Sequence, residues 1–313
     1  MKRAIVVGSE GQDGRLLFDR LVADGCEVLG IGRKSARASN APEARSVSIE
    51  DREDVMRAVN EWTPEAVFYL AAVHQSSEDQ GPADDFRLLE RSFGINVGGV
   101  ARFLDALKGR RDTTLFYAAS SMVFGEPDSN RQDENTPFRP TTPYGITKAA
   151  GIHVCRYYRE HHGVRASTGI LYNHESPLRR ANFVSQKIAR GAVAIARGDQ
   201  EQLVVGDLGA RVDWGYAPDF IDAMIRIASQ PVSDDYVVAT GEAHSVLEFV
   251  EIAFMHVGLN WREHVVEDRA LLSRNQVTRV GDSTRLRERT GWSPTTTFAG
   301  MVEILVDAAG GAP

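Results

Sequence analysis

Cysteine is scarce in this sequence, since only Cys26 and Cys155 occur among its 313 residues. They are far apart and lack the short spacings of metal sites and redox motifs, so the sequence predicts two reduced thiols and no metal site. A run of about 18 consecutive apolar residues, the length that a membrane span needs, is also missing. These absences indicate a cytoplasmic protein without a membrane segment.

An excess of positive charge is missing as well: Lys and Arg number 36 against 43 Asp and Glu, which gives a net charge of -7. This balance argues against a nucleic-acid binder and against attraction to an anionic membrane. The apolar run Ala4–Val7 is too short for a signal peptide. Anionic ligands would therefore be held by local clusters of arginine and lysine.

Short apolar segments alternate with helical patterns in the first half of the chain. This order implies βαβ units and a parallel, doubly wound sheet, that is, an α/β Rossmann domain over residues 1–172. The expected strands are Ala4–Val7, Val28–Ile31, Ala66–Ala72, Leu115–Ala119 and Ser167–Tyr172.

Residues 173–313 are less regular and are expected to form mainly a smaller C-terminal α/β lobe that binds the substrate. Segments near 212–240 are expected to return to the first domain. Helical patterns cover 183–196, 246–257 and 298–306. The polar stretch 127–143 is expected to be a loop that either covers the substrate or simply connects two elements.

A glycine-rich turn follows the first expected strand and opens a helix. It contains Gly8, Gly11 and Gly14, with Gln12 and Asp13 between the last two glycines. Glycines allow a tight turn and close backbone approach to a pyrophosphate, whose charge the helix N-terminus favours. In this context the turn predicts a dinucleotide site.

The end of the second expected strand indicates which dinucleotide is bound. An acidic residue there would select NAD, but this chain has Arg33 and Lys34. Two cations suit a 2′-phosphate, so NADP is favoured and NAD remains possible. Asp51 either meets the adenine or caps a helix. Ala71 and Ala72, at the end of the third apolar strand, are expected beside the cofactor.

Three further side chains form a proton-transfer device. Tyr144 and Lys148 are four residues apart and project from one face of a helix. A lysine ammonium beside a phenol is expected to lower the pKa of the tyrosine. Ser120, at a strand end, can hold a substrate oxygen against that phenol. This set suits making or reducing a carbonyl next to a dinucleotide.

These motifs resemble the extended short-chain dehydrogenase/reductases that modify nucleotide sugars, and within that group the GDP-mannose 4,6-dehydratase family. The resemblance covers nearly the whole chain. Besides the glycine-rich turn and Tyr-x-x-x-Lys, it is carried by 120–125, by Asn-His-Glu-Ser-Pro at 173–177, and by 183–188, 211–219, 238–241 and 281–292.

The resemblance implies a GDP-sugar substrate and a role for several residues. Asn173, Lys187 and Arg211 are expected to hold the GDP portion, and Lys and Arg suit its phosphates. Arg274 is expected to be a further phosphate ligand or else a surface arginine. The family also suggests a homodimer or homotetramer, with Arg37 at an interface.

One departure from the family bears on the chemistry. Where a dehydratase carries a glutamate that removes a proton beside the new ketone, this chain has Met122, which cannot move a proton. Ser121 and Met122 are still expected in the substrate pocket. Dehydration is disfavoured unless Glu126, Glu134 or His74 reaches the site.

The leading hypothesis is an epimerase that transiently oxidises C4 of a GDP-sugar, with Tyr144 as acid and base. The alternative is an NADPH-dependent reductase of a GDP-4-keto-sugar. A 4,6-dehydratase and a non-catalytic dinucleotide-binding protein are less favoured.

Overall fold

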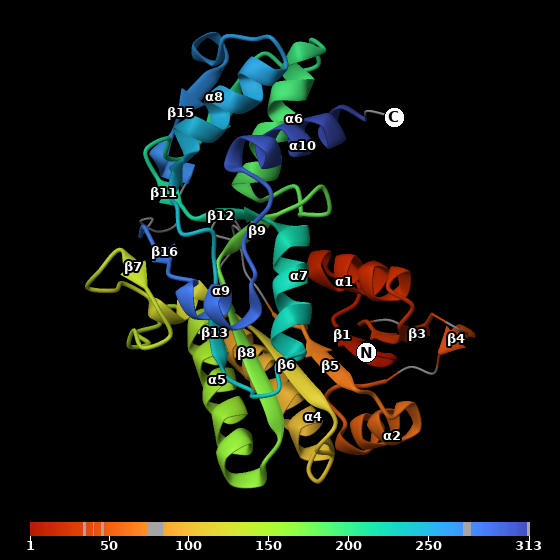
Figure 1. Cartoon of the computed structure of the whole chain (residues 1–313). Helices are drawn as coiled ribbons and strands as arrows, with labels where there is room; N and C mark the ends of the chain where they lie inside the picture. Colours follow the sequence, from red (N-terminus) through yellow and green to blue (C-terminus); the bar gives the residue numbers. More distant parts are fainter. Residues whose placement is uncertain (34–35, 40, 45–46, 74–83, 272–276, 312–313) are drawn as a thin grey trace.

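The computed structural model describes residues 1–33, 36–39, 41–44, 47–73, 84–271 and 277–311. Its central sheet has the strand order β13-β8-β6-β5-β1-β2-β3-β4 (Figure 1). The strands from β13 to β2 are parallel, and β3 and β4 form an antiparallel edge. These strands are β1 (Arg3–Val7), β2 (Glu27–Ile31), β3 (Ala36–Ala38), β4 (Ala41–Ala44), β5 (Ala66–Tyr69), β6 (Thr114–Ser120), β8 (Arg165–Leu171) and β13 (Asp235–Val238).

Helices cover both faces of this sheet. On one face α1 (Gln12–Ala23) contacts α7 (Ala217–Ala228), and on the other α2 (Arg52–Trp62), α4 (Val100–Ala106) and α5 (Pro143–His162) pack in a row (Figure 1). A helix α3 (Asp85–Ser92) and a π-helical segment η1 (Phe93–Gly99) precede α4. The predicted α/β fold with a doubly wound parallel sheet is confirmed.

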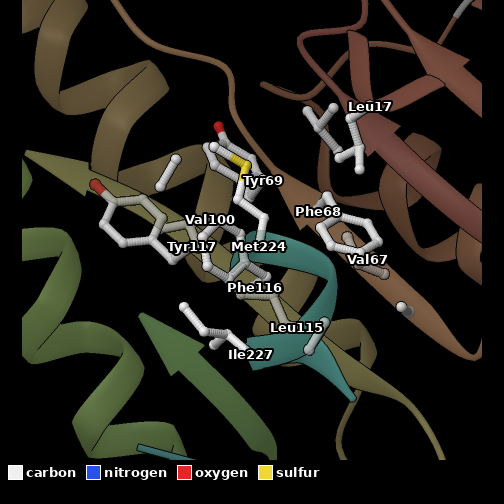
Figure 2. Packing of buried hydrophobic residues seen from close by; sticks show 14 of the residues in the cluster. Leu17, Val67, Phe68, Tyr69, Val100, Leu115, Phe116, Tyr117, Met224 and Ile227 are labelled. Atoms are coloured by element: carbon white, nitrogen blue, oxygen red, sulfur yellow. The ribbon is translucent and has the colours of Figure 1, made fainter. Parts of the chain in front are cut away.

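Aromatic side chains on β5 and β6 fill both sides of the sheet. Phe68 and Phe116 are partners in register, with ring centroids 6.1 Å apart, and Tyr69 and Tyr117 follow at 6.2 Å. Because successive residues of a strand point to opposite faces, the two pairs lie on opposite sides (Figure 2). The Tyr117 hydroxyl donates to the carbonyl of Asn96 at 3.0 Å, within η1. The burial of these rings fixes the sheet against its helices.

The C-terminal lobe has its own buried apolar cluster. It is built on α6 (Val184–Ala196), α8 (Val246–His256) and α10 (Phe298–Gly310), which pack together (Figure 1). Short strand pairs complete it and link it to the sheet: β10 (Leu203–Val205) with β15 (Val265–Glu267), β11 (Arg211–Val212) with β14 (His244–Ser245), and β9 (Asn173–Glu175) with β12 (Trp214–Tyr216).

The chain returns to the larger core after entering the lobe. Side chains of α7 and β13 belong to the larger cluster, and so do Leu286 of α9 (Thr284–Thr290) and Trp292. In the stretch 127–143, β7 (Arg131–Gln132) pairs with β16 (Val280–Gly281). The remaining short helices are η2 (Ser121–Phe124), η3 (Trp261–Glu263) and η4 (Arg269–Leu271). Among the described residues, no helix combines the length and apolar character needed to cross a membrane.

Candidate functional site

The glycine-rich turn is packed too tightly for side chains. Gly8 has φ +91°, and a Cβ there would lie 2.7 Å from the backbone nitrogen of Ala71. A Cβ on Gly14 would lie 2.7 Å from the Cα of Ser9. Gly11 precedes the first residue of α1. The backbone of the turn therefore borders the cleft at the start of a helix, where an anion is favoured.

A cleft of about 1360 Å³ runs from this turn into the C-terminal lobe. It brings together residues that are far apart in the sequence. Among the predicted site residues, its walls contain Gly8, Gly11, Gln12, Asp13, Gly14, Arg33, Ala71, Ala72, Ser120, Met122, Tyr144, Lys148 and Asn173.

Tyr144 and Lys148 lie on the first two turns of α5, and Ser120 ends β6. The helix is started by Thr142, whose hydroxyl accepts a hydrogen bond from the Gly145 amide at 3.1 Å. The Lys148 ammonium lies 5.7 Å from the ring centroid of Tyr144 and donates to the carbonyl of Ala118 at 2.5 Å. Ser120 hydrogen-bonds the Tyr144 phenol.

Burial decides the ionisation of both groups. It raises the pKa of Tyr144 to about 12, although Arg179 and the hydrogen bond with Ser120 act in the opposite direction. It lowers the pKa of Lys148 to about 7, against the charge of Asp13. The prediction that Lys148 lowers the pKa of Tyr144 is therefore wrong for this structure, because burial disfavours both the phenolate and the ammonium.

The Asn-His-Glu-Ser-Pro segment contacts the glycine-rich turn directly. The His174 Nε2 lies 3.0 Å from the Asp13 carboxylate, and the Gln12 amide donates to the His174 carbonyl at 3.1 Å. The Ser176 hydroxyl donates to Gln12 Oε1 at 3.0 Å. His174 also stacks on Phe220 of α7, with centroids 4.6 Å apart. These contacts clasp the turn from a segment more than 150 residues away.

The two charged groups of this clasp shift each other's ionisation. Burial opposes the Asp13 carboxylate, but the charge of His174 and hydrogen bonds outweigh it and lower the pKa of Asp13 to about 2. Burial likewise opposes the imidazolium, yet Asp13 raises the pKa of His174. Glu175, in the same segment, accepts a hydrogen bond from the Ser185 hydroxyl at 2.6 Å and pairs with Arg179 at 3.4 Å.

The wall beside Ser120 contains Met122. Its sulfur accepts a hydrogen bond from Arg279 at 3.2 Å, while Ser121 is buried and does not line the cleft. Of the acids considered as replacements, Glu126 lines the cleft. Glu134 instead accepts from the Val237 amide at 2.8 Å and pairs with Arg285 at 3.5 Å, away from the cleft wall. His74 lies outside the described residues.

The residues predicted to hold the nucleotide are only partly brought together. Asn173 lines the cleft. Lys187 is half-buried on α6 and is not part of the cleft wall. Arg211 is exposed, donates to the carbonyl of Ala243 at 2.5 Å, and also lies off the wall. Arg274 lies outside the described residues.

Cationic groups that were not predicted from the sequence also line the cleft. Arg179 packs on the ring of Phe183 at 3.8 Å, and Arg180 and Arg279 are also on the wall. The adjacent pair Arg179 and Arg180, two residues after the Asn-His-Glu-Ser-Pro segment, could have signalled an anion site. Arg279 has no local signal.

At the end of the cleft beside β2, Arg33 lines the wall and Lys34 lies outside the described residues. Asp51 follows the capping alternative: its carboxylate accepts from the amides of Glu53 at 2.8 Å and Asp54 at 3.0 Å, and it does not line the cleft. Glu10, which was not predicted as a site residue, lines the cleft beside Arg33.

The fold and this cleft define an extended short-chain dehydrogenase/reductase of the nucleotide-sugar-modifying class. A family model described as GDP-mannose 4,6 dehydratase matches residues 5–305. The chain belongs to that family. "GDP-mannose 4,6 dehydratase 1" of Arabidopsis thaliana is 34% identical over 98% of this chain and 89% of its own length. "GDP-mannose 4,6 dehydratase" of Homo sapiens is 32% identical over 97% of this chain and 90% of its own.

Solved structures share the fold over nearly the whole chain. RMD from Pseudomonas aeruginosa complexed with NADPH has a TM-score of 0.84 and 24% identity, covering 100% of both chains. UDP-glucose 4-epimerase of Thermus thermophilus in complex with NAD has a TM-score of 0.81 and 25% identity, covering 99% of this chain and 100% of its own.

Proposed function

We propose that this protein is an NAD(P)-dependent GDP-sugar epimerase that acts by transient oxidation at C4. The observation that carries the proposal is the combination of an intact Ser120, Tyr144 and Lys148 set with Met122 on the same wall. The redox groups are all present, whereas the neighbouring side chain at 122 has no proton to give or take. The GDP portion of the substrate is inferred from the family and its named relatives.

The residues of the chain perform the proton transfers. In the oxidation, Tyr144 takes the proton of the C4 hydroxyl, Ser120 holds the oxygen as it becomes a carbonyl, and the C4 hydrogen leaves as hydride. The glycine-rich turn and Lys148 would hold an oxidised nicotinamide dinucleotide, which would supply the hydride acceptor and a positive charge that favours the phenolate. Tyr144 returns its proton when hydride is restored to the opposite face of the sugar, which inverts C4 with no net change in mass.

The alternative is reduction of a GDP-4-keto-sugar that another enzyme supplies. The raised pKa of Tyr144, about 12, favours this alternative, because the phenol is the form that donates a proton to a ketone. Dehydration would need a carboxylate beside C5. Glu126 is the candidate on the cleft wall, and the names of the relatives keep this reaction as a third possibility.

The proposal also covers the dinucleotide that is bound, the oligomeric state and the cellular compartment. The Arg33 side chain on the wall favours NADP, whereas the Glu10 carboxylate beside it favours NAD, and the titles of the structural neighbours contain both NADPH and NAD. We propose a homodimer or homotetramer in the cytoplasm. The guanidinium of Arg37, the suggested interface residue, lies 3.6 Å from the Asp19 carboxylate. Its Cζ atom also lies 3.9 Å from the ring centroid of Phe18. A gel-filtration mass equal to one chain would contradict the oligomer.

The test is the product formed from a panel of GDP-hexoses, measured by mass and proton NMR. An unchanged mass with an inverted C4 proton coupling supports the epimerase. Oxidation of NADPH on addition of a 4-keto GDP-sugar supports the reductase. Loss of one water would show that dehydration proceeds with Met122 in place, and would refute the main inference. Tyr144→Phe serves as the inactive control.

A further inference from the structure

The side chain of Glu10 reaches from the glycine-rich turn to the end of β2. Its Oε2 accepts a hydrogen bond from the backbone amide of Arg33 at 3.3 Å. A Cβ on Gly32 would lie 2.5 Å from the carboxyl carbon of Glu10, so the carboxylate rests directly against Gly32. Glu10, Gly32 and Arg33 all line the same cleft.

This position is where a βαβ dinucleotide site meets the ribose of adenosine. In NAD sites an acidic residue at the end of the second strand accepts hydrogen bonds from the ribose hydroxyls. The two residues that follow β2 here, Gly32 and Arg33, include no acid. Glu10 brings a carboxylate to the same place from a different element, and Gly32 leaves room for it.

We propose that the Glu10 carboxylate accepts hydrogen bonds from the ribose hydroxyls of the adenosine and makes the protein select NAD over NADP. The inference rests on the proposed dinucleotide site and deepens it. A 2′-phosphate would bring negative charge against this carboxylate, and like charges at short range repel. Arg33 acts in the opposite sense through its guanidinium, but its backbone amide, a donor that a phosphate could use, is occupied by Glu10.

A purely structural role predicts a different outcome on substitution. If Glu10 only holds the end of β2 through the Arg33 amide, a neutral acceptor in its place would do the same work. Glu10→Gln keeps an oxygen for that amide and removes the charge, so it separates selectivity from local structure. Glu10→Asp keeps the charge on a shorter side chain.

The experiment titrates the full chain with NADH and NADPH separately, following cofactor fluorescence, and repeats the titrations for each variant. Glu27→Gln is the matched control, because it removes the same charge from the opposite end of the same strand. Melting curves recorded without dinucleotide check that each variant is folded.

We expect the native chain to bind NADH at least tenfold more tightly than NADPH. Glu10→Gln should reduce or reverse this ratio by tenfold or more, while Glu10→Asp and Glu27→Gln retain the preference for NADH. A native preference for NADPH, or a ratio changed less than twofold by Glu10→Gln, would overturn the inference and leave the proposed function standing. Failure of the folded native chain to bind either dinucleotide would overturn both.

Discussion

The contact between His174 and Asp13 is a partly buried ion pair that joins the glycine-rich turn to a segment beyond β8. The perturbation that probes it is the pair of substitutions His174→Gln and Asp13→Asn, made singly and together. Each removes one charge and keeps a polar side chain of similar size. The double-mutant cycle then isolates the interaction between the two groups from their other contacts.

The magnitude follows from the pKa of Asp13. Its fall from 3.8 to about 2 corresponds to about 2.5 kcal/mol of preference for the charged form in the folded state. The side chains of His174 and Asp13 are 9% and 22% exposed, so solvent screens the pair only in part. We expect a coupling free energy of about 2 kcal/mol while both groups are charged.

The contribution of the pair to the stability of the fold decreases both at low pH, through Asp13, and at high pH, through His174. The folded pKa of Asp13 is depressed, so its contribution is present above 3.8 and is lost as the pH falls toward 2. The folded pKa of His174 is raised, so its contribution is complete below 6.5 and is lost as the pH rises through the folded value. The coupling should therefore be largest between these limits.

The assay is urea unfolding of the four proteins at about pH 5 and about pH 9. The expected result is a coupling of about 2 kcal/mol at the lower pH that falls to about 1 kcal/mol or less once His174 is neutral, because the neutral imidazole has a single N–H for either the Asp13 carboxylate or the Tyr172 carbonyl. The surface pair His256 and Asp307, 30% and 59% exposed, is the matched control and should give less than about 1 kcal/mol. A coupling below about 0.5 kcal/mol at both pH values would refute the reasoning.

Three further predictions concern the cleft itself. Tyr144→Phe should lower turnover by at least about 100-fold and change dinucleotide affinity little, as product assays and titrations would show, since it removes the proton that is transferred. Lys148→Met should raise the free energy of unfolding by roughly 2–4 kcal/mol near neutral pH while abolishing turnover, because burial holds the pKa of Lys148 at about 7. The stability gain should shrink toward pH 10.5, the ordinary value of a lysine, and its absence in denaturation curves would contradict the burial argument. Gly14→Ala should weaken dinucleotide binding or destabilise the turn, since its Cβ would lie 2.7 Å from the Cα of Ser9, whereas Gly310→Ala, with nothing within 4 Å, should change neither in binding and melting experiments.

The fold could be predicted because its signals are local. Strands that are buried on both faces appear in the sequence as continuous apolar runs, and glycines mark the turns between them. The end of β5 was harder: the apolar run continues to Ala72, but the strand ends at Tyr69. Ala71 instead packs against Gly8 in the neighbouring turn, a contact across the sheet that no local pattern contains.

The site residues that could be predicted are those that belong to motifs with a characteristic spacing. The glycine-rich turn and the Tyr144 and Lys148 pair line one cleft, as their spacing indicated. Single cations were not predictable in this way. Arg211 turns toward Glu248, 3.4 Å away, while Arg279, which has no motif, reaches the wall at Met122. Only tertiary packing decides which arginine meets the cleft.

The Asn-His-Glu-Ser-Pro segment shows that a motif typical of a family need not determine which reaction a member catalyses. His174 and Ser176 bond the glycine-rich turn, and Glu175 bonds Ser185 on α6. The segment thus ties the glycine-rich turn to α6 of the C-terminal lobe, which is a structural role. In the proposed reaction the proton is moved by Tyr144 of α5, and an additional proton transfer for dehydration would need an acid or base where this chain has Met122, just after β6. The signature therefore indicates the family and its fold, whereas Met122 at the position of the dehydratase glutamate is the reason for proposing a reaction other than dehydration.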